Sequence, residues 1–301
     1  MFYQDVARLV LNSDSPFVLL SSAHIQTKSW SLPSWVPLWH ENAPRTLRPF
    51  RPHPQFRCAD GSRIAPQIKI SNTGRDLLVY GLVLERIKVV PGFPNLIYWI
   101  TSQSGSIFPS HYRKRNSDWQ GLLCKIGSRE GALESFAMTL TCGTDHSGYL
   151  VNNVSSHLAD FAVCFESPQF NWSVLDNIPQ RKERRGNPNK DSAGEEFERG
   201  EGKPRILLCR VGATLANHTM FSTESGLLGM GPSKSMEDGD LVCVLFGADV
   251  PFLLGPTYDG GYLVVGECYM YDIMHGEVLD RLEDPDSQSG TRLEPTWLKL
   301  V

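Results

Sequence analysis

The last third of the chain consists of short apolar runs separated by glycine-containing turns, and this pattern limits the folds open to it. The runs that we expect to be strands are 205–211, 220–223, 241–246, 250–254 and 262–269. Between them lie the expected turns 226–232, 238–240, 247–249 and 258–261. Short strands with glycine turns at this spacing are typical of a meander that closes into a small barrel. We therefore predict antiparallel strands from Pro204 to Leu279.

A second strand region lies much earlier in the chain. Residues 67–70 alternate between polar and apolar, 72–74 form a turn, and a long apolar run follows from Leu77 to Val90. The end of that run alternates clearly, with Ile87 and Val89 on one face. Gly81 inside the run suggests a bulge or a sharp bend.

The block between these two regions has helical periodicity instead. Its apolar stripes comprise Trp119, Leu122, Leu123 and Ile126, then Leu133, Phe136, Ala137 and Leu140, then Val151, Val154, Leu158, Phe161 and Phe165. Strands on both sides of helices predict an α+β fold, a small antiparallel β-barrel built from strands on both sides of a helical insertion.

The expected organisation follows from these patterns. An N-terminal helix and a segment rich in Trp and Pro occupy 1–54, the first barrel strands 55–90 and the helical insertion 91–180. A charged, disordered loop is expected at 181–204, the remaining barrel strands at 205–280 and a tail at 281–301, because the loop has too few apolar residues to offset its ordering entropy.

Net charge, cysteine content and the lack of long apolar stretches indicate which partners and which cellular location to expect. The formal net charge is −4, so nothing favours nucleic acid or an anionic membrane as partner. The seven cysteines show no CxxC motif and no Cys/His spacing of a zinc site, and an odd number argues against a secreted disulfide framework. The N-terminus does not resemble a signal peptide and no apolar stretch is long enough to span a bilayer. We expect a cytoplasmic protein.

The glycine-rich stretch 226–231 faintly resembles a phosphate-binding loop. It lacks the Gly-Lys-Ser/Thr ending of a P-loop, and no helical pattern follows it. Turn glycines are the better interpretation.

Four polar residues near predicted strand ends are the candidates for chemistry: Asp240, Glu267, His275 and Glu277. Two carboxylates with a histidine are suited to acid–base catalysis or to metal binding. The alternative is ordinary turn chemistry, since Asp-Gly-Asp is common where a strand starts. No known nucleophile motif is present, and we expect no catalytic residue, no metal and no cofactor.

Several phrases, taken together, resemble the fungal heterokaryon-incompatibility proteins, specifically the region that follows their incompatibility domain. The matching phrases lie at 32–39, 139–142, 226–232, 239–247, 250–254, 262–269 and 273–277. The resemblance implies a barrel-and-helix module in proteins of non-self recognition and programmed cell death. It also implies that the incompatibility domain is absent here, so that the chain is a stand-alone module or a fragment whose Met1 is not the true start.

The resemblance also indicates two departures from the family pattern. Leu38 stands where the family usually has Asp, and Gly255 stands where it usually has Arg, which removes two polar residues from any interaction that they serve. We expect a non-enzymatic module that contacts a protein carrying an incompatibility domain, through the barrel rim and through Trp30, Trp35 and Trp39. The alternative is a small-ligand-binding or hydrolytic barrel enzyme that uses the four polar residues.

Overall fold

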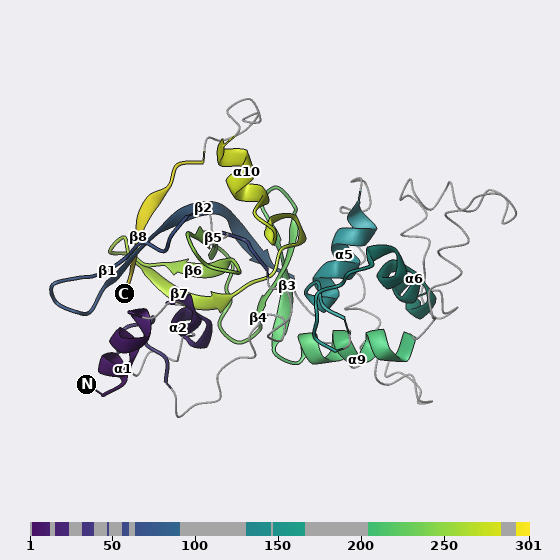
Figure 1. Cartoon of the computed structure of the whole chain (residues 1–301), viewed down its shortest axis with the longest axis horizontal. Coiled ribbons are helices and arrows are strands. Elements are labelled where there is room, and N and C mark those ends of the chain that lie inside the picture. The colour runs from purple at the N-terminus through teal and green to yellow at the C-terminus, as the bar shows by residue number, and fades with distance from the viewer. Residues whose placement is uncertain are drawn as a thin grey trace, which may run out of the picture. The chain divides into compact units, whose positions relative to one another are not determined.

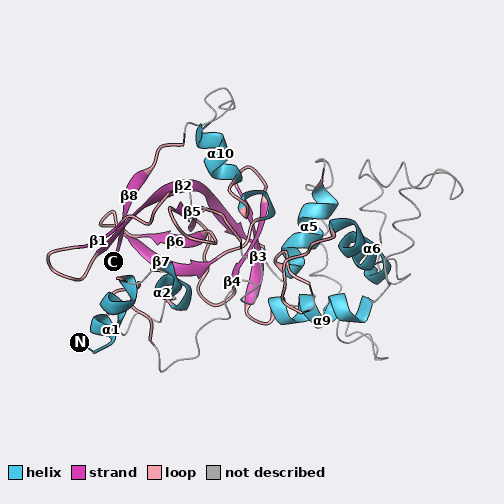
Figure 2. Cartoon of the chain, viewed as in Figure 1, coloured by secondary structure: helices cyan, strands magenta, loops and turns pink. Residues whose placement is uncertain are grey.

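The structure is a computed structural model that describes residues 2–12, 16–23, 32–38, 47, 56–59, 64–90, 131–145, 147–165, 204–283 and 293–301. Its helices are α1 (Phe2–Leu11), α2 (Phe17–Ser22), α5 (Ala132–Thr141), α6 (Val154–Phe165), α9 (Pro204–Leu215), the 3₁₀ turn η3 (Tyr271–Ile273) and α10 (Glu277–Glu283). Its strands are β1 (Ile68–Ile70), β2 (Leu77–Val89), β3 (His218–Thr223), β4 (Leu228–Pro232), β5 (Leu241–Leu245), β6 (Phe252–Pro256), β7 (Tyr262–Glu267) and β8 (Thr296–Leu300). The α+β class is confirmed, and Figures 1 and 2 show the arrangement.

The strands form one sheet around the long strand β2. Its order is β4-β3-β2-β5-β6-β7-β8, with β1 beside β2. Strand β8 also pairs with β2, antiparallel from Leu77↔Leu300 to Gly81↔Thr296, and touches β7 at the parallel pair Tyr262↔Leu300. The pairings from β2 through β5, β6, β7 and β8 thus return to β2, so this part of the sheet is partly ring-like.

The two parts of strand β2 pair with different strands. Its first part pairs with β1, β5 and β8, whereas its last residues pair with β3 through Ile87↔Thr223 and Val89↔Phe221. The register shift lies between Val83 and Arg86 and not at Gly81, where a bulge was expected. Gly81 instead permits a close approach, because a Cβ there would lie 2.4 Å from the carbonyl oxygen of Val244.

The predicted strand at 205–211 is wrong: these residues belong to helix α9. The buried side chains Leu207, Val211 and Leu215 follow one another at intervals of four residues, which is the spacing of one helix face. A short apolar run does not distinguish strand from helix, and the run here continues through Gly212 to Leu215 as a full helix.

The glycine-rich stretch is only partly a turn. Gly226 has a φ of +81° and turns the chain, but β4 begins at Leu228. Gly229 and Gly231 lie in this strand, and a Cβ on Gly229 would lie 2.1 Å from Cζ of Phe221. A Cβ on Gly231 would lie 2.7 Å from Cδ1 of Leu253. These two glycines let the neighbouring side chains pack against the backbone of the strand.

The segment expected to be a tail contains strand β8. Leu298 and Leu300 are buried while Trp297 is 37% exposed, as the alternation of a half-buried strand requires. The predicted helices near the N-terminus, at 133–140 and at 151–165 are present as α1, α5 and α6. The predicted helix at 119–126 and the charged loop at 181–204 fall outside the described residues, apart from Pro204, which begins α9.

The chain divides into two compact units, which are described separately. Unit 1 comprises residues 1–48, 55–89 and 220–301, and unit 2 comprises 49–54 and 90–219. Unit 2 contains α5, α6 and α9. In it the rings of Phe136 and Phe161 meet edge to face at 5.9 Å, and Nε2 of the buried His157 lies 3.1 Å from the Thr141 hydroxyl.

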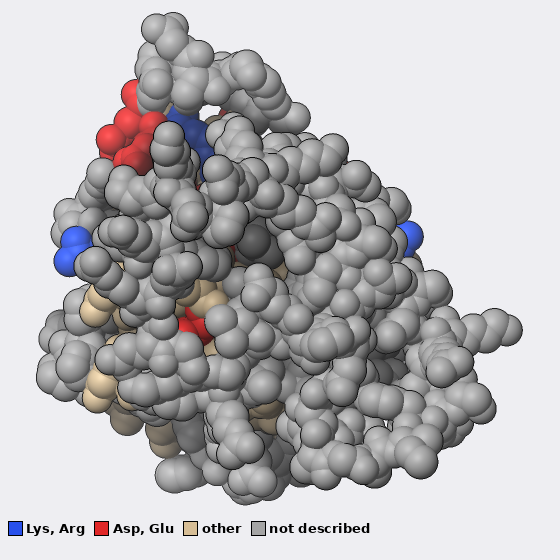
Figure 3. Space-filling model, turned by 90° about the vertical axis from the view of Figure 1, so that its right-hand side faces the viewer, with Lys and Arg blue, Asp and Glu red and all other residues tan. Residues whose placement is uncertain are grey.

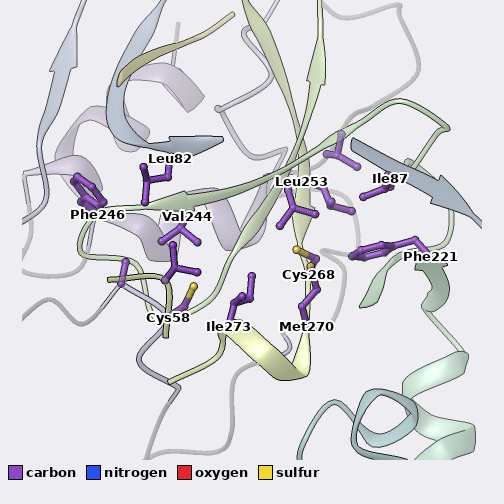
Figure 4. Packing of buried hydrophobic residues seen from close by; sticks show 14 of the residues in the cluster. Cys58, Leu82, Ile87, Phe221, Val244, Phe246, Leu253, Cys268, Met270 and Ile273 are labelled. Carbon is purple, nitrogen blue, oxygen red and sulfur yellow. The ribbon is translucent and has the colours of Figure 1, made fainter. Parts of the chain in front are cut away.

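The core of unit 1 is a cluster of buried side chains from β2, β3, β5, β6, β7, the 3₁₀ turn and α10 (Figure 4). Leu82, Val244 and Leu253 are fully buried within it, together with Cys58 and Cys268. Burial raises the pKa of the Cys58 thiol well above its ordinary value, and nearby Glu277 adds to the effect. Cys58 is therefore a neutral packing residue.

Candidate functional site

Asp240 lies directly before β5 and is only 6% exposed. Its Oδ2 accepts a hydrogen bond from the Glu237 N–H at 2.8 Å, and its carbonyl oxygen accepts one from the Ile87 N–H at 2.9 Å. Burial raises the pKa of the Asp240 carboxyl to about 6, against the lowering effect of the Glu237 N–H. The carboxylates of Glu237 and Asp238 raise that pKa further. The side chain closes the turn that precedes β5.

Glu267 is the last residue of β7 and is 7% exposed. Its Oε2 accepts a hydrogen bond from the Leu47 N–H at 2.8 Å, across 220 positions of sequence. The carboxylate therefore holds a segment that is distant in sequence to the end of β7.

Asp240 and Glu267 lie at opposite ends of three neighbouring strands. Leu241 pairs with Leu254, whereas Glu267 pairs with Phe252, which in turn pairs with Cys243. The two acids are two strands apart and are offset by three residues along the strands. Their Cα atoms are therefore about 14 Å apart. General acid–base partners need to be within hydrogen-bond reach of one reacting group, so these two side chains do not form such a pair.

His275 and Glu277 lie in a different setting from the one expected. Glu277 begins helix α10 and is not at a strand end. Its Oε2 accepts a hydrogen bond from the backbone N–H of His275 at 2.8 Å, and the exposed His275 ring lies 6.0 Å from the ring of Phe56. The contact that joins the two residues is a hydrogen bond from the main chain of His275 to the carboxylate, not a contact between carboxylate and imidazole.

Trp35 is completely buried, so it presents no contact surface. Its indole Nε1 donates a hydrogen bond to the Arg75 carbonyl oxygen at 2.9 Å and thereby fastens the segment 32–38 to the turn before β2. Trp30 and Trp39 lie outside the described residues. Leu38 and Gly255, where the family pattern has polar residues, are both buried.

Sequence reasoning missed Ser34, which joins two strand ends. Its N–H donates to the Val301 carbonyl oxygen at 2.8 Å, and its hydroxyl donates to the same oxygen. The hydroxyl oxygen also accepts a hydrogen bond from the Val264 N–H at 3.0 Å. Nothing in the local sequence indicates this, because Val264 and Val301 are more than 200 positions away.

Residues 209–287 match the Het-6 beta-barrel domain family. A stretch of 69 residues is 42% identical to "Heterokaryon incompatibility protein 6, OR allele" of Neurospora crassa. The resemblance to the heterokaryon-incompatibility family is thereby confirmed. The aligned stretch covers 22% of this chain and 10% of the Neurospora protein, so the chain corresponds to a small part of that relative. No solved structure matches the chain.

We call residues 209–287 the Het-6 region. It contains β3 to β7 and α10, but β1, β2 and β8 lie outside it. The ring-like part of the sheet therefore requires strands from beyond the matched region, since β5 pairs with β2 and β2 pairs with β8.

The described part of the chain also bears on other kinds of site. Within it, no three His, Cys, Asp or Glu side chains gather as metal ligands would. No helix among the described residues is both long and apolar enough to cross a membrane. On the face in Figure 3, the described charged residues include a group of acidic side chains with basic side chains beside it.

Proposed function

We propose that this chain is a non-enzymatic protein-interaction module of fungal heterokaryon incompatibility, acting in non-self recognition and the cell death that follows it. The observation that carries the proposal is the match of residues 209–287 to the Het-6 beta-barrel domain. The 42% identity to a Neurospora incompatibility protein over 69 residues supports the same role.

The finer architecture belongs to the same proposal. We infer that the ring-like pairing of β2, β5, β6, β7 and β8 is a closed barrel. The antiparallel pairing of β8 with β2 and the contact of β8 with β7 support this. Closure removes exposed strand edges, which suits a module that must remain folded while part of its surface is free to bind.

The positions of the candidate acids support a non-enzymatic role. Asp240, Glu267 and Glu277 each accept a hydrogen bond from a backbone N–H, which belongs to a nearby residue for Asp240 and Glu277 and to the distant Leu47 for Glu267. A carboxylate used in this way stabilises a turn or a strand end. The rival proposal, a ligand-binding or hydrolytic enzyme, is favoured by the raised pKa of Asp240 alone.

The expected partner is a protein that carries an incompatibility domain, and the expected location is the cytoplasm. Cys58, Cys142 and Cys243 are buried free thiols, which is usual in a reducing compartment. The partner and the location follow from the family and are part of the proposal.

The test is co-expression in hyphae with the Neurospora protein, read out as growth rate and uptake of a vital dye. We expect the pair to change viability, whereas each protein alone does not. The double variant Asp240→Asn, Glu267→Gln keeps both acceptor oxygens and removes both charges. A non-enzymatic module retains its effect in this variant. Loss of the effect in a variant that is still folded supports the enzyme, and no effect of the wild-type pair contradicts the proposed function.

A further inference from the structure

The turn between β6 and β7 presents an aromatic side chain that has no packing role within the described part of the chain. Tyr258 has a relative exposure of 113%, the highest of the large apolar residues in the described segments. A tyrosine that packs on nothing contributes no burial to stability, so the fold does not depend on its side chain.

This turn is held rigidly by residues on both sides of Tyr258. The Thr257 N–H donates to the Gly261 carbonyl oxygen at 2.9 Å, and the Gly261 N–H donates to the Thr257 hydroxyl at 3.0 Å. The Thr257 hydroxyl donates in turn to Oδ1 of Asp259. This hydrogen bond is the main reason why the pKa of Asp259 is lowered. Gly260 has a φ of +76°, which a glycine adopts without strain. The backbone at Tyr258 is thus held by hydrogen bonds on both sides, which reduces the entropy that the turn loses when it binds.

The outer face of β8 continues this surface. Asp259 lies 3.9 Å from Nζ of Lys299, and Lys299 lies two residues from Trp297 on the same face of the strand. Trp297 is 37% exposed, and Nζ of Lys69 lies 4.3 Å from the centroid of its ring. The ring of Tyr80 lies against the same tryptophan at 5.1 Å. We call Tyr258, Trp297, Lys69 and Lys299 the Tyr258 surface.

The charges of this surface favour an acidic partner. Lys69 lies over the Trp297 ring, and the ion pair of Asp259 with Lys299 is long and solvent-exposed, so it holds Lys299 only weakly. Lys69 and Lys299 are therefore available to carboxylates of another molecule, although the whole chain has a formal net charge of −4.

We propose that the Tyr258 surface is the contact through which this module binds its protein partner, and that the partner offers an apolar pocket for the Tyr258 ring bordered by Asp or Glu side chains. The inference rests on the proposed function, since it names the surface of that interaction. Tyrosine and tryptophan are among the side chains that most often carry the binding free energy of protein interfaces.

The experiment measures binding of the full chain to the Neurospora incompatibility protein, immobilised as the probe, by biolayer interferometry at two salt concentrations. Tyr258→Ser is expected to weaken binding at least tenfold with no change in the thermal midpoint, because the side chain is fully exposed. Lys299→Glu is expected to weaken binding severalfold.

Asp259→Asn distinguishes charge recognition from simple support of the turn. Asparagine keeps the oxygen that accepts the Thr257 hydrogen bond but no longer attracts Lys299. If carboxylates of the partner contact Lys299, this variant binds at least as tightly as the wild type, with a steeper dependence on salt. Equal weakening by Asp259→Asn and Lys299→Glu overturns the acidic partner.

Two variants elsewhere on unit 1 serve as matched controls. Leu9→Ser alters an apolar side chain that is 72% exposed, and Lys234→Glu reverses an exposed charge. Both are expected to bind within twofold of the wild type. If Tyr258→Ser binds normally, the Tyr258 surface is overturned while the module's proposed function stands. If the wild type does not bind the probe, the proposed partner is overturned, and the inference with it.

Discussion

At the scale of single residues, several acidic side chains in the described part of the chain accept hydrogen bonds from the backbone. Asp145 accepts hydrogen bonds from the N–H groups of Ser147 and Tyr149, and Asp238 accepts one from Val89 at 2.7 Å. Asp240 and Glu267 do the same at buried places. An acid at the end of a strand is equally suited to catalysis and to a turn, so residue type alone could not decide between them. The distance between Asp240 and Glu267 shows that these two acids do not form one acid–base pair.

Asp240 makes stability depend on pH in a defined direction. Its pKa is raised to about 6 in the folded chain, against about 3.9 when unfolded, so between these values the folded state binds a proton that the unfolded state releases. The stabilisation is fully present below about pH 4 and is lost as the pH rises through about 6. Asp240→Asn is neutral throughout. At about pH 7.5 it should therefore be more stable than the wild type, by about 1 kcal/mol after allowance for partial hydration.

The measurement is urea denaturation of both proteins from about pH 3.5 to about pH 7.5, which spans the two pKa values. The difference in free energy of unfolding should shrink as the pH falls, because the wild-type carboxyl becomes neutral as well. If the Asp240→Asn variant is instead less stable at the upper end of this range, the charged form is the one that the fold requires.

Gly229 tests the close packing of β4. An alanine Cβ there would meet Phe221 at 2.1 Å and Met270 at 2.8 Å, so the core must shift to admit it. We expect Gly229→Ala to destabilise the chain by about 1–3 kcal/mol in urea denaturation. Gly212→Ala is the matched control, because Gly212 lies in α9 with nothing within 4 Å of the added Cβ. It should be neutral or stabilising by up to about 1 kcal/mol. Similar losses in both variants would contradict the packing role.

At the scale of elements, the segment 32–38 supports the place where β7 and β8 meet. The two strands share only the pair Tyr262↔Leu300, and Ser34 links Val264 within β7 to Val301, which follows β8. Ser34→Ala leaves the Val264 N–H without this acceptor, which should cost about 1–3 kcal/mol. Hydrogen exchange should show faster exchange in β7 and β8. Ser22→Ala, which removes an exposed hydroxyl on α2, should change stability by less than about 0.5 kcal/mol. Unchanged exchange in the Ser34 variant would show that the link is dispensable.

The elements also show which parts of the fold could be predicted. Strands β5, β6 and β7 were predicted because their apolar runs are bounded by turns such as 258–261. Helix α9 was mistaken for a strand, although the spacing of Leu207, Val211 and Leu215 contained the helical signal. Strand β4 could not be predicted, because glycine has low strand propensity and Gly229 is there for the space it leaves to Phe221. The alternation that marks β8 was in the sequence and was missed.

At the scale of the whole molecule, unit 1 is assembled from chain segments that come before and after residues 90–219 in the sequence. This arrangement follows from β2, which precedes unit 2 and pairs with β3, β5 and β8, all of which lie at or beyond its end. The sequence predicted strands on both sides of an insertion because strand periodicity returns after a helical block. It could not predict the pairing of β8 with β2, since a pairing across more than 200 residues depends on the whole sheet.

The pairing of β2 with β3 leads to a test of the two units. Val89 pairs directly with Phe221, so the two ends of unit 1 that flank unit 2 are neighbouring strand positions. Replacing residues 90–219 by a glycine-rich loop of about four residues should therefore leave unit 1 folded. We expect a single cooperative urea transition and slow hydrogen exchange in β2, β5 and β6. The Het-6 region alone, residues 209–287, should be unfolded. It lacks β2, which pairs with β5, and β8, which pairs with β2. A folded 209–287 fragment, or an unfolded loop variant, would show that the matched region and not unit 1 is the folding unit.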